Sequence, residues 1–267
     1  MDGAIITFYF RARAPSHASV DGIMSAMTGN HREQVHKRLM KAVCRVILDD
    51  NKPLVLKGGT ALLLCYGLDR FSEDLDFDIE CSLRGHINIE SVCRQAVKLA
   101  NKDGSQIRLE AFFKQKKTET THRCRPSFSM PGESTPFSIK IEISSRQLPV
   151  QHEIAIINGV KVYRANAIAR QKLLAATEDP RRNYRTAARD LHDLAFLASK
   201  FEADLSADVL ADLESFFADQ EALLMRYADA YDMDPILSGR IFADLSVIEA
   251  WVHDRDEPEG PTLFGPG

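Results

Sequence analysis

The stretch Leu54–Glu80, LVLKGGTALLLCYGLDRFSEDLDFDIE, starts as an apolar strand, turns on two glycines and ends in a second strand. In that second strand, three aspartates alternate with apolar residues: Asp74, Leu75, Asp76, Phe77, Asp78 and Ile79. Since alternate residues of a strand share a face, the carboxylates line one side and the apolar side chains point into the core. The pattern fits either a charged, solvated edge strand or a site for cations.

A second strand favours the cation site. In FSIKIEIS, residues 137–144, the apolar residues occupy one face, and Lys140 and Glu142 share the other. If this strand lies beside the acidic one, Glu142 joins Asp74 and Asp76. Three carboxylates on rigid strands suit one or two Mg²⁺ ions that also hold phosphates. The alternative for Glu142 is the ordinary polar alternation of an exposed strand face.

The KGGT turn, Lys57–Thr60, lies between the first strand and a short helix expected from Thr60 to Tyr66. Backbone N–H groups and the helix N-terminus then point at one spot, which favours an anion. The spacing is not that of a Walker A loop, which requires GxxxxGK[ST]. The turn therefore predicts a phosphate site beside the acidic strand.

The net charge of −4 and a pI near 6.1 give no global nucleic-acid signature, so any such contact needs a local patch. Two basic runs are candidates for RNA or triphosphate contacts, or are simply solvated: Lys114, Lys116 and Lys117, and Arg181, Arg182, Arg185 and Arg189. Five cysteines without a CxxC pair argue against disulfides or zinc and fit a reducing cytoplasm. No apolar run is long enough to cross a membrane.

The order of the expected elements is helix, then mixed helix and strand, then helix alone. Helical spacing starts at His31, and Asn158-Gly159 between two short apolar runs predicts a hairpin. We therefore expect an α+β fold: a mixed β-sheet domain with flanking helices, followed by a helical domain. The expected divisions are an N-terminal extension or linker (1–30), the sheet domain (31–164), the helical domain (165–253) and a disordered tail (254–267).

The GG[ST] turn, the DxD pair and a third carboxylate on a later strand together resemble the nucleotidyltransferase signature of the polymerase-beta-like superfamily. The fuller wording, KGGTAL followed by RFSEDLDF, is closer to the AbiEii/AbiGii-type nucleotidyltransferase toxins of bacterial type IV toxin–antitoxin and abortive-infection systems. IKIE, QKLLAA and RDLHDL resemble the later motifs of that family, so the resemblance runs from Leu54 to Leu197. The third motif departs from the family's KxxAxxxR, because Asp179 stands where the arginine is expected.

The resemblance implies roles for the matching residues. The nucleotide-binding set is Lys57, Gly58, Gly59, Thr60, Arg70 and Lys140. The metal ligands are Asp74, Asp76 and Glu142. The catalytic set adds to these three carboxylates Ser72, Lys172, Asp190 and Asp193. Without the resemblance, Lys172 would be interpreted as a surface lysine, and the two helical aspartates as surface charges or partners of Arg185 and Arg189. His122, His152 and His192 have no metal-ligand spacing and are interpreted as structural or surface residues.

The family resemblance implies a cytoplasmic phage-defence toxin that transfers an NMP from an NTP with Mg²⁺ and pairs with an antitoxin encoded nearby. By analogy the acceptor is RNA, specifically the 3′ end of tRNA. Two alternatives remain: an enzyme that nucleotidylates a protein hydroxyl, such as an AMPylating enzyme, and a non-catalytic NTP-binding module. Three carboxylates around a metal favour an enzyme, because nucleotide binding alone does not need them.

Overall fold

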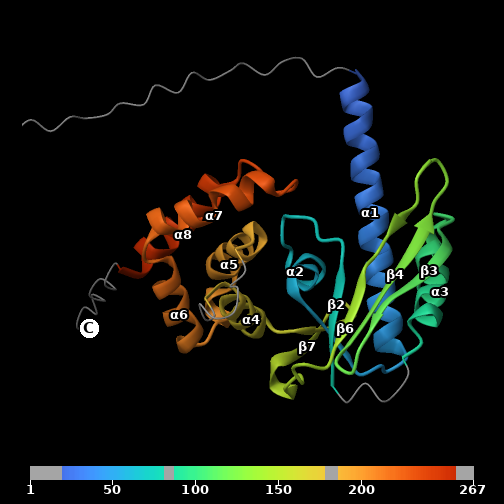
Figure 1. The fold of residues 1–267 in the computed structure, drawn as a ribbon, viewed down its shortest axis with the longest axis horizontal. Coiled ribbons are helices and arrows are strands. Elements are labelled where there is room, and N and C mark those ends of the chain that lie inside the picture. The colour runs from blue at the N-terminus through green and yellow to red at the C-terminus, as the bar shows by residue number, and fades with distance from the viewer. Residues whose placement is uncertain (1–19, 81–86, 178–185, 257–267) are drawn as a thin grey trace, which may run out of the picture. The chain divides into compact units, whose positions relative to one another are not determined.

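The computed structural model describes the backbone of residues 20–80, 87–177 and 186–256. The chain forms two compact units, Met1–Val35 and His36–Gly267. In the first unit the described residues belong to helix α1 (Val20–Asp49). The helix expected from His31 therefore begins earlier, and residues 20–30 are helical rather than part of a linker. The second unit holds the rest of α1, from His36, and all the other elements (Figure 1).

The second unit contains one mixed sheet of eight strands in the order β3-β4-β6-β2-β1-β8-β7, with β5 paired to β4. The β2–β6 and β1–β8 pairs are parallel and the others antiparallel. The strands are β1 (Leu54–Lys57), β2 (Leu75–Ile79), β3 (Arg108–Lys117), β4 (Thr121–Ser129), β5 (Phe137–Ser138), β6 (Ile141–Ser144), β7 (Ile154–Ile157) and β8 (Val160–Tyr163). Because β2 lies between β6 and β1, interpreting it as an edge strand is wrong.

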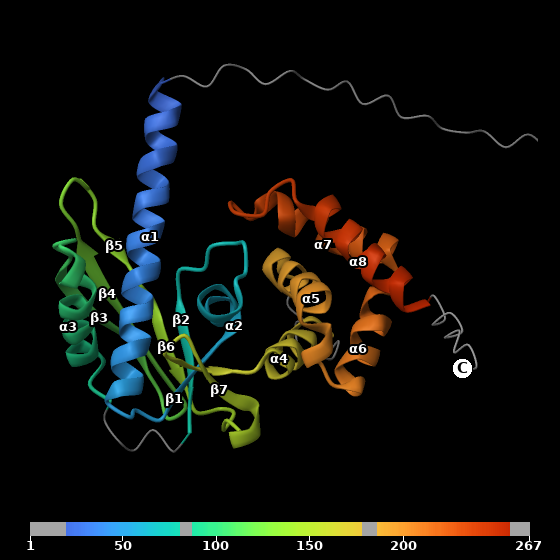
Figure 2. The same cartoon turned by 180° about the vertical axis from the view of Figure 1, so that it is seen from behind.

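The helices divide into those near the sheet and those that follow it. Near the sheet are the part of α1 from His36 onward, α2 (Gly58–Ala61) with the π-helical turn η1 (Leu62–Tyr66), α3 (Ile89–Ala100) and the 3-10 turns η2 (Asn101–Asp103) and η3 (Gln151–Glu153). After β8 the described elements are all helical: α4 (Ala165–Thr177), α5 (Ala188–Phe201), η4 (Glu202–Asp204), α6 (Ala207–Phe217), α7 (Gln220–Met233) and α8 (Ile241–Asp256). The expected α+β fold with a mixed sheet and a helical C-terminal part is confirmed (Figures 1 and 2).

Strand periodicity explains the two faces of the sheet. Leu54, Leu56, Leu75 and Phe77 are fully or almost fully buried, and each pairs with another apolar residue across the strands.

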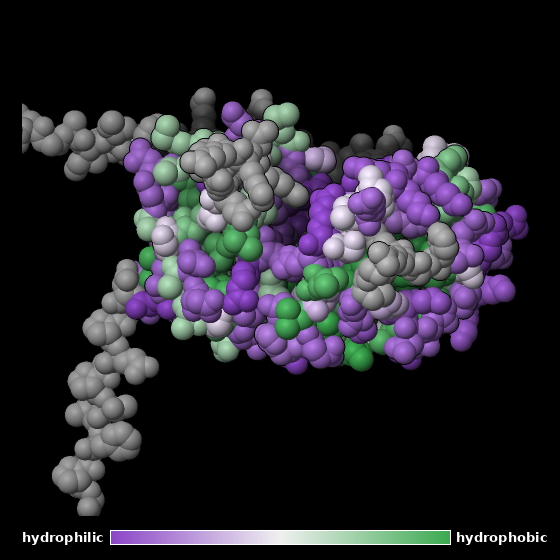
Figure 3. All heavy atoms as spheres, turned by 60° about the horizontal axis from the view of Figure 1, so that its bottom comes forward, coloured by the Kyte–Doolittle hydropathy of each residue, from purple (hydrophilic) through white to green (hydrophobic). Residues whose placement is uncertain are grey.

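The hairpin predicted at Asn158-Gly159 joins β7 to β8, and both turn residues have positive φ (52° and 74°), as a type I′ turn requires. The face seen in Figure 3 is mostly hydrophilic, with apolar side chains in smaller groups. None of the described helices is long and apolar enough to cross a membrane.

Candidate active site

A cavity of about 490 Å³ lies where the sheet meets the first helices of the helical half. The sheet side contributes Lys57, Gly58, Gly59, Arg70, Ser72, Glu73, Asp74, Asp76, Lys140 and Gln147. The helical side contributes Ile168, Gln171, Lys172, Ala175, Arg189 and Asp190. Thus most of the predicted site residues share one cavity. Thr60, Glu142 and Asp193 are not among the residues that line it.

The glycine turn forms one wall of this cavity. Gly58 has φ +72°, a conformation that L side chains rarely adopt. A Cβ atom built at Gly59 would overlap Nη2 of Arg70, so the guanidinium packs directly against the turn. Helix α2 starts at Gly58, ahead of the expected Thr60, which places the N-terminus of the α2–η1 segment at the cavity wall. The positive end of the helix dipole there favours an anion.

Thr60 and Ser72 connect the glycine turn to the acidic strand. The Thr60 hydroxyl donates to the backbone carbonyl of Asp74 and lies 2.7 Å from the Ser72 hydroxyl. Both side chains are buried, and only Ser72 reaches the cavity. In this structure Thr60 therefore fixes the position of the turn relative to Asp74, and its hydroxyl is engaged away from the place a phosphate would occupy.

The strand register places the carboxylates side by side. Asp76 pairs with Lys57 of β1 on one side and with Glu142 of β6 on the other. The predicted neighbourhood of the two strands is therefore present, and β2 and β6 run parallel. Burial raises the pKa of Asp76, and the nearby Asp74 and Glu142 carboxylates raise it further, against the opposing effect of Lys140 and Lys57. The two lysines therefore do not fully balance the negative charge around Asp76.

Each of the other carboxylates on this face already has a cationic partner. Asp74 forms an ion pair with Lys140. Glu142 accepts from Nε of Arg123 at 2.8 Å, which turns its carboxylate toward β4. Asp78 is buried and accepts from Lys57 at 2.5 Å and from the Tyr163 hydroxyl at 3.1 Å, so it is a structural anchor.

A divalent metal fits the donor set only in part. Asp74 and Asp76 line the cavity and supply hard oxygen ligands of the kind Mg²⁺ prefers. Among the described residues, no three His, Cys, Asp or Glu are arranged to hold a metal ion by themselves. Phosphate oxygens of a bound nucleotide would have to complete the coordination, as they commonly do for Mg²⁺.

A buried ion-pair network reaches this cavity from the helical half. Lys172 of α4 is 8% exposed, and its ammonium lies 3.0 Å from Asp190 and 2.6 Å from Asp193 of α5. Arg70 donates to both carboxylate oxygens of Asp193, at 2.7 and 2.6 Å. Burial alone would raise the pKa of Asp193, but Lys172 and Arg70 hold it below its ordinary value. These are not surface charges, so that alternative interpretation is wrong.

Sequence reasoning missed a second contact between the halves, next to the first. His192 of α5 is buried, with Nε2 lying 3.0 Å from Asp69 and Nδ1 lying 2.9 Å from Asp244 of α8. Arg240 also donates to Asp69, and Tyr231 donates to Asp244 at 2.5 Å. The available signal was weak: Asp69 adjoins Arg70, and His192 adjoins Asp193.

Arg189 lines the cavity and pairs with Asp234. Arg181, Arg182 and Arg185 lie outside the described residues.

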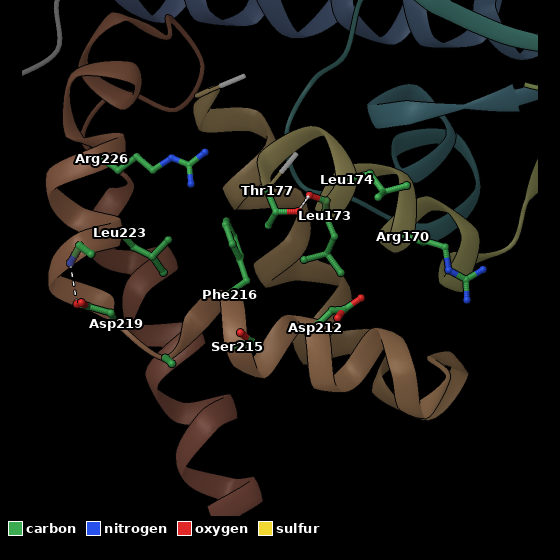
Figure 4. A pocket seen from close by; sticks show the side chains of 12 residues that line it. Arg170, Leu173, Leu174, Thr177, Asp212, Ser215, Phe216, Asp219, Leu223 and Arg226 are labelled. Atoms are coloured by element: carbon green, nitrogen blue, oxygen red, sulfur yellow. Dashed lines mark hydrogen bonds between the residues drawn. The ribbon is translucent and has the colours of Figure 1, made fainter. Parts of the chain in front are cut away.

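A second cavity, of about 500 Å³, lies within the helical half (Figure 4). Side chains from α4, α6 and α7 surround it, among them Arg170, Leu173, Phe216 and Arg226. Arg170 pairs with Glu153 and Asp208, and Arg226 donates to the carbonyl of Ala176. It contains none of the predicted site residues.

A glycine turn at a helix N-terminus lies beside paired carboxylates on a mixed sheet, and together they line one cavity, an arrangement that suits a nucleotide with its metal ion. The profile of the family described as "Nucleotidyl transferase AbiEii toxin, Type IV TA system" matches residues 38–258. The chain belongs to this family of nucleotidyltransferase toxins. Membership implies a nucleotide substrate and an antitoxin partner.

Solved structures support the assignment. The crystal structure of JHP933 from Helicobacter pylori is 30% identical with a TM-score of 0.70, over 84% of this chain and 93% of that one. A second H. pylori crystal structure is 30% identical with a TM-score of 0.69, over 84% of this chain and 96% of that one. No curated protein sequence matches the chain.

Proposed function

We propose that this toxin acts in the cytoplasm as a Mg²⁺-dependent enzyme that transfers an NMP from an NTP to the 3′ hydroxyl of an RNA, with the tRNA 3′ end as the acceptor expected from the family. The observation that carries the proposal is the shared cavity. Lys172 of the helical half lines the same cavity as Gly58, Gly59, Asp74 and Asp76 of the sheet half, which supports the proposal. A triphosphate bound there meets phosphate-binding groups on two walls.

The residues of the chain divide the work. The glycine turn receives phosphate oxygens at the helix N-terminus, and Lys140 and Lys172 neutralise charge as point cations. Asp74 and Asp76 would hold Mg²⁺, which would supply positive charge beside the phosphates. Arg70 acts indirectly: its guanidinium packs against Gly59 while it is bound to Asp193, so it sets the position of the turn.

Transfer itself is an in-line displacement that needs positioning more than covalent chemistry. The acceptor oxygen forms a bond to the α-phosphorus, the bond from that phosphorus to the bridging oxygen breaks, and pyrophosphate leaves. The proton of the acceptor hydroxyl passes to solvent water, which balances the step. Asp193 lies behind the cavity wall and supports Lys172, so we assign it a positioning role.

The deciding experiment offers the protein each α-labelled NTP with Mg²⁺, together with either total RNA or total protein from a bacterial lysate. We expect label in RNA of tRNA size, and loss of label with EDTA. Label in protein alone would refute the RNA acceptor and establish protein nucleotidylation. Label in neither fraction, with an intact NTP-binding signal, would refute the proposed transfer.

A further inference from the structure

One face of the sheet carries an unbroken row of charged residues across five strands. Lys57, Asp76 and Glu142 are directly paired neighbours, and the row continues through Arg123 of β4 to Lys116 of β3. Directly paired residues of neighbouring strands point to the same face. Since strands lie about 4.8 Å apart, Lys116 is about 14 Å from Asp76 along this row. The candidate active site therefore continues into a basic strip at the β3–β4 edge.

Two further residues of this face widen the strip. Arg125 is exposed and pairs in register with Phe113, whose side chain is 57% exposed. Neither Arg125 nor Lys116 forms an ion pair with any residue that the structure describes. The strand register shifts between Lys114 and Lys116, and this irregularity brings Lys116 opposite Arg123. Such bulges often redirect a side chain beside a functional site.

The opposite face of the same strands is packed only in part: it buries Cys124 and Phe128, but it also carries the exposed Lys114 and Lys117. Cys124, between Arg123 and Arg125, is buried. Helix α3 packs against β3, and its Cys93 is buried, as Cys124 is. The basic strip, which we define as Phe113, Lys116, Arg123 and Arg125, lies on the active-site face, whereas Lys114 and Lys117 point to the other face.

We propose that the basic strip binds the RNA acceptor, with Lys116 and Arg125 contacting backbone phosphates and Phe113 stacking on an unpaired base near the 3′ end. This inference rests on the RNA acceptor proposed above and adds where that acceptor lies. Unpaired cations beside an exposed aromatic ring are the pattern of single-stranded nucleic-acid sites. An acidic protein would use the cations, but it would have no need for an aromatic platform.

The test uses full-length protein and unfractionated bacterial tRNA. In the double variant Lys116→Ala/Arg125→Ala, we expect the KM for tRNA to rise about tenfold and the dependence of log affinity on log salt to become shallower by about 1.4–1.8, as for two lost phosphate contacts. The KM for the preferred NTP should stay within about twofold, because neither residue lines the cavity. Phe113→Ala should weaken tRNA binding, and Phe113→Trp should restore it.

The matched control is Lys98→Ala/Lys102→Ala. It removes the same charge from exposed residues on the α3–η2 segment. We expect tRNA affinity to stay within about twofold there. Three results would overturn the proposal that the basic strip binds RNA. The double variant could bind tRNA as well as the control variant does, or it could lose NTP binding as much as tRNA binding. It could also keep tRNA binding and lose binding to an acidic protein. Wild-type protein that labels no RNA would instead refute the proposed function itself.

Discussion

At the scale of single residues, the Asp76 carboxylate is expected to serve catalysis and to reduce the stability of the fold. Its carboxylate is buried beside Asp74 and Glu142, and its pKa is raised. Two positions further along β2, Asp78 is equally part of the sheet but is held by Lys57 and Tyr163. The negative charge of Asp78 is therefore balanced by a cation and a hydroxyl donor, whereas that of Asp76 is not fully balanced by its neighbours.

We expect Asp76→Asn to lower turnover about a thousandfold, because metal ligation contributes several kcal/mol to the transition state. The same change should raise the Tm by roughly 2–4 °C, which corresponds to about 1 kcal/mol, because it removes a repelled charge. Asp78→Asn is the control and should lower the Tm, since it weakens the ion pair between the buried Asp78 and the half-buried Lys57. Thermal melts and labelled-NTP assays measure both. A lower Tm for Asp76→Asn would contradict the interpretation that the buried Asp76 carboxylate destabilises the folded protein.

Gly59 gives a second prediction at this scale. Gly59→Ala should cost about 1–3 kcal/mol and most of the activity, because Arg70 is fixed by Asp193 and cannot move away from the new methyl group. Gly67→Ala is the control: its φ is +82°, but nothing lies within 4 Å of the new atom, so only backbone strain remains. Chemical denaturation compares the two. Full activity in Gly59→Ala would show that Arg70 does not position the turn.

At the scale of elements, local patterns predicted the central strands well. The alternation in LDFDI and IKIEIS placed β2 and β6 correctly, and Asn158-Gly159 located the β7–β8 hairpin. FSIKIEIS was expected as one strand, yet it splits into β5 and β6. The gap lies opposite Pro126 of β4, which has no N–H to donate, and Ile139 donates to its carbonyl instead. Sequence alternation alone does not show what a neighbouring strand can donate.

The α4–α5 ion pairs predict how stability depends on pH. The folded pKa of Asp193 is below its ordinary value near 4, so its stabilising contribution is complete above that value and is lost as pH falls through the lowered pKa. At neutral pH, Asp193→Asn should cost about 3 kcal/mol, because Arg70 and Lys172 lose a buried partner. The Tm difference between wild type and variant should shrink below about pH 4. A difference that is constant from pH 7 to pH 3 would contradict the ion-pair origin.

At the scale of the whole molecule, sequence predicted the residue types of the site but not their partners. Arg70 and Asp193 are 123 positions apart, as are Asp69 and His192. No local periodicity reports such a distance, so the contacts that join the sheet to the helices could not be foreseen. Those contacts decide whether Lys172 faces the glycine turn.

We expect Asp69→Ala to raise the KM for NTP several-fold, because it releases His192 and Arg240 from the loop that carries Arg70 and Ser72. The Tm should fall by less than about 4 °C, since the Asp69 side chain is 58% exposed and its ion pair with Arg240 contributes at most about 1 kcal/mol. Asp208→Ala removes a comparable arginine partner, that of Arg170, and should leave the KM unchanged. Equal KM values for both variants would show that the loop contact does not shape the cavity.

The Lys140–Asp74 ion pair has a consequence for the order of binding. Lys140 must leave Asp74 before that carboxylate can ligate a cation, and an incoming phosphate offers the ammonium an alternative partner. We therefore expect calorimetry to show weak Mg²⁺ binding to the protein alone and strong binding with NTP, whereas Lys140→Ala binds the metal alone more tightly. Equally strong binding without NTP would contradict this exchange. If this exchange occurs, the toxin without nucleotide binds little Mg²⁺, and its rate depends on the cellular concentration of the metal–nucleotide complex.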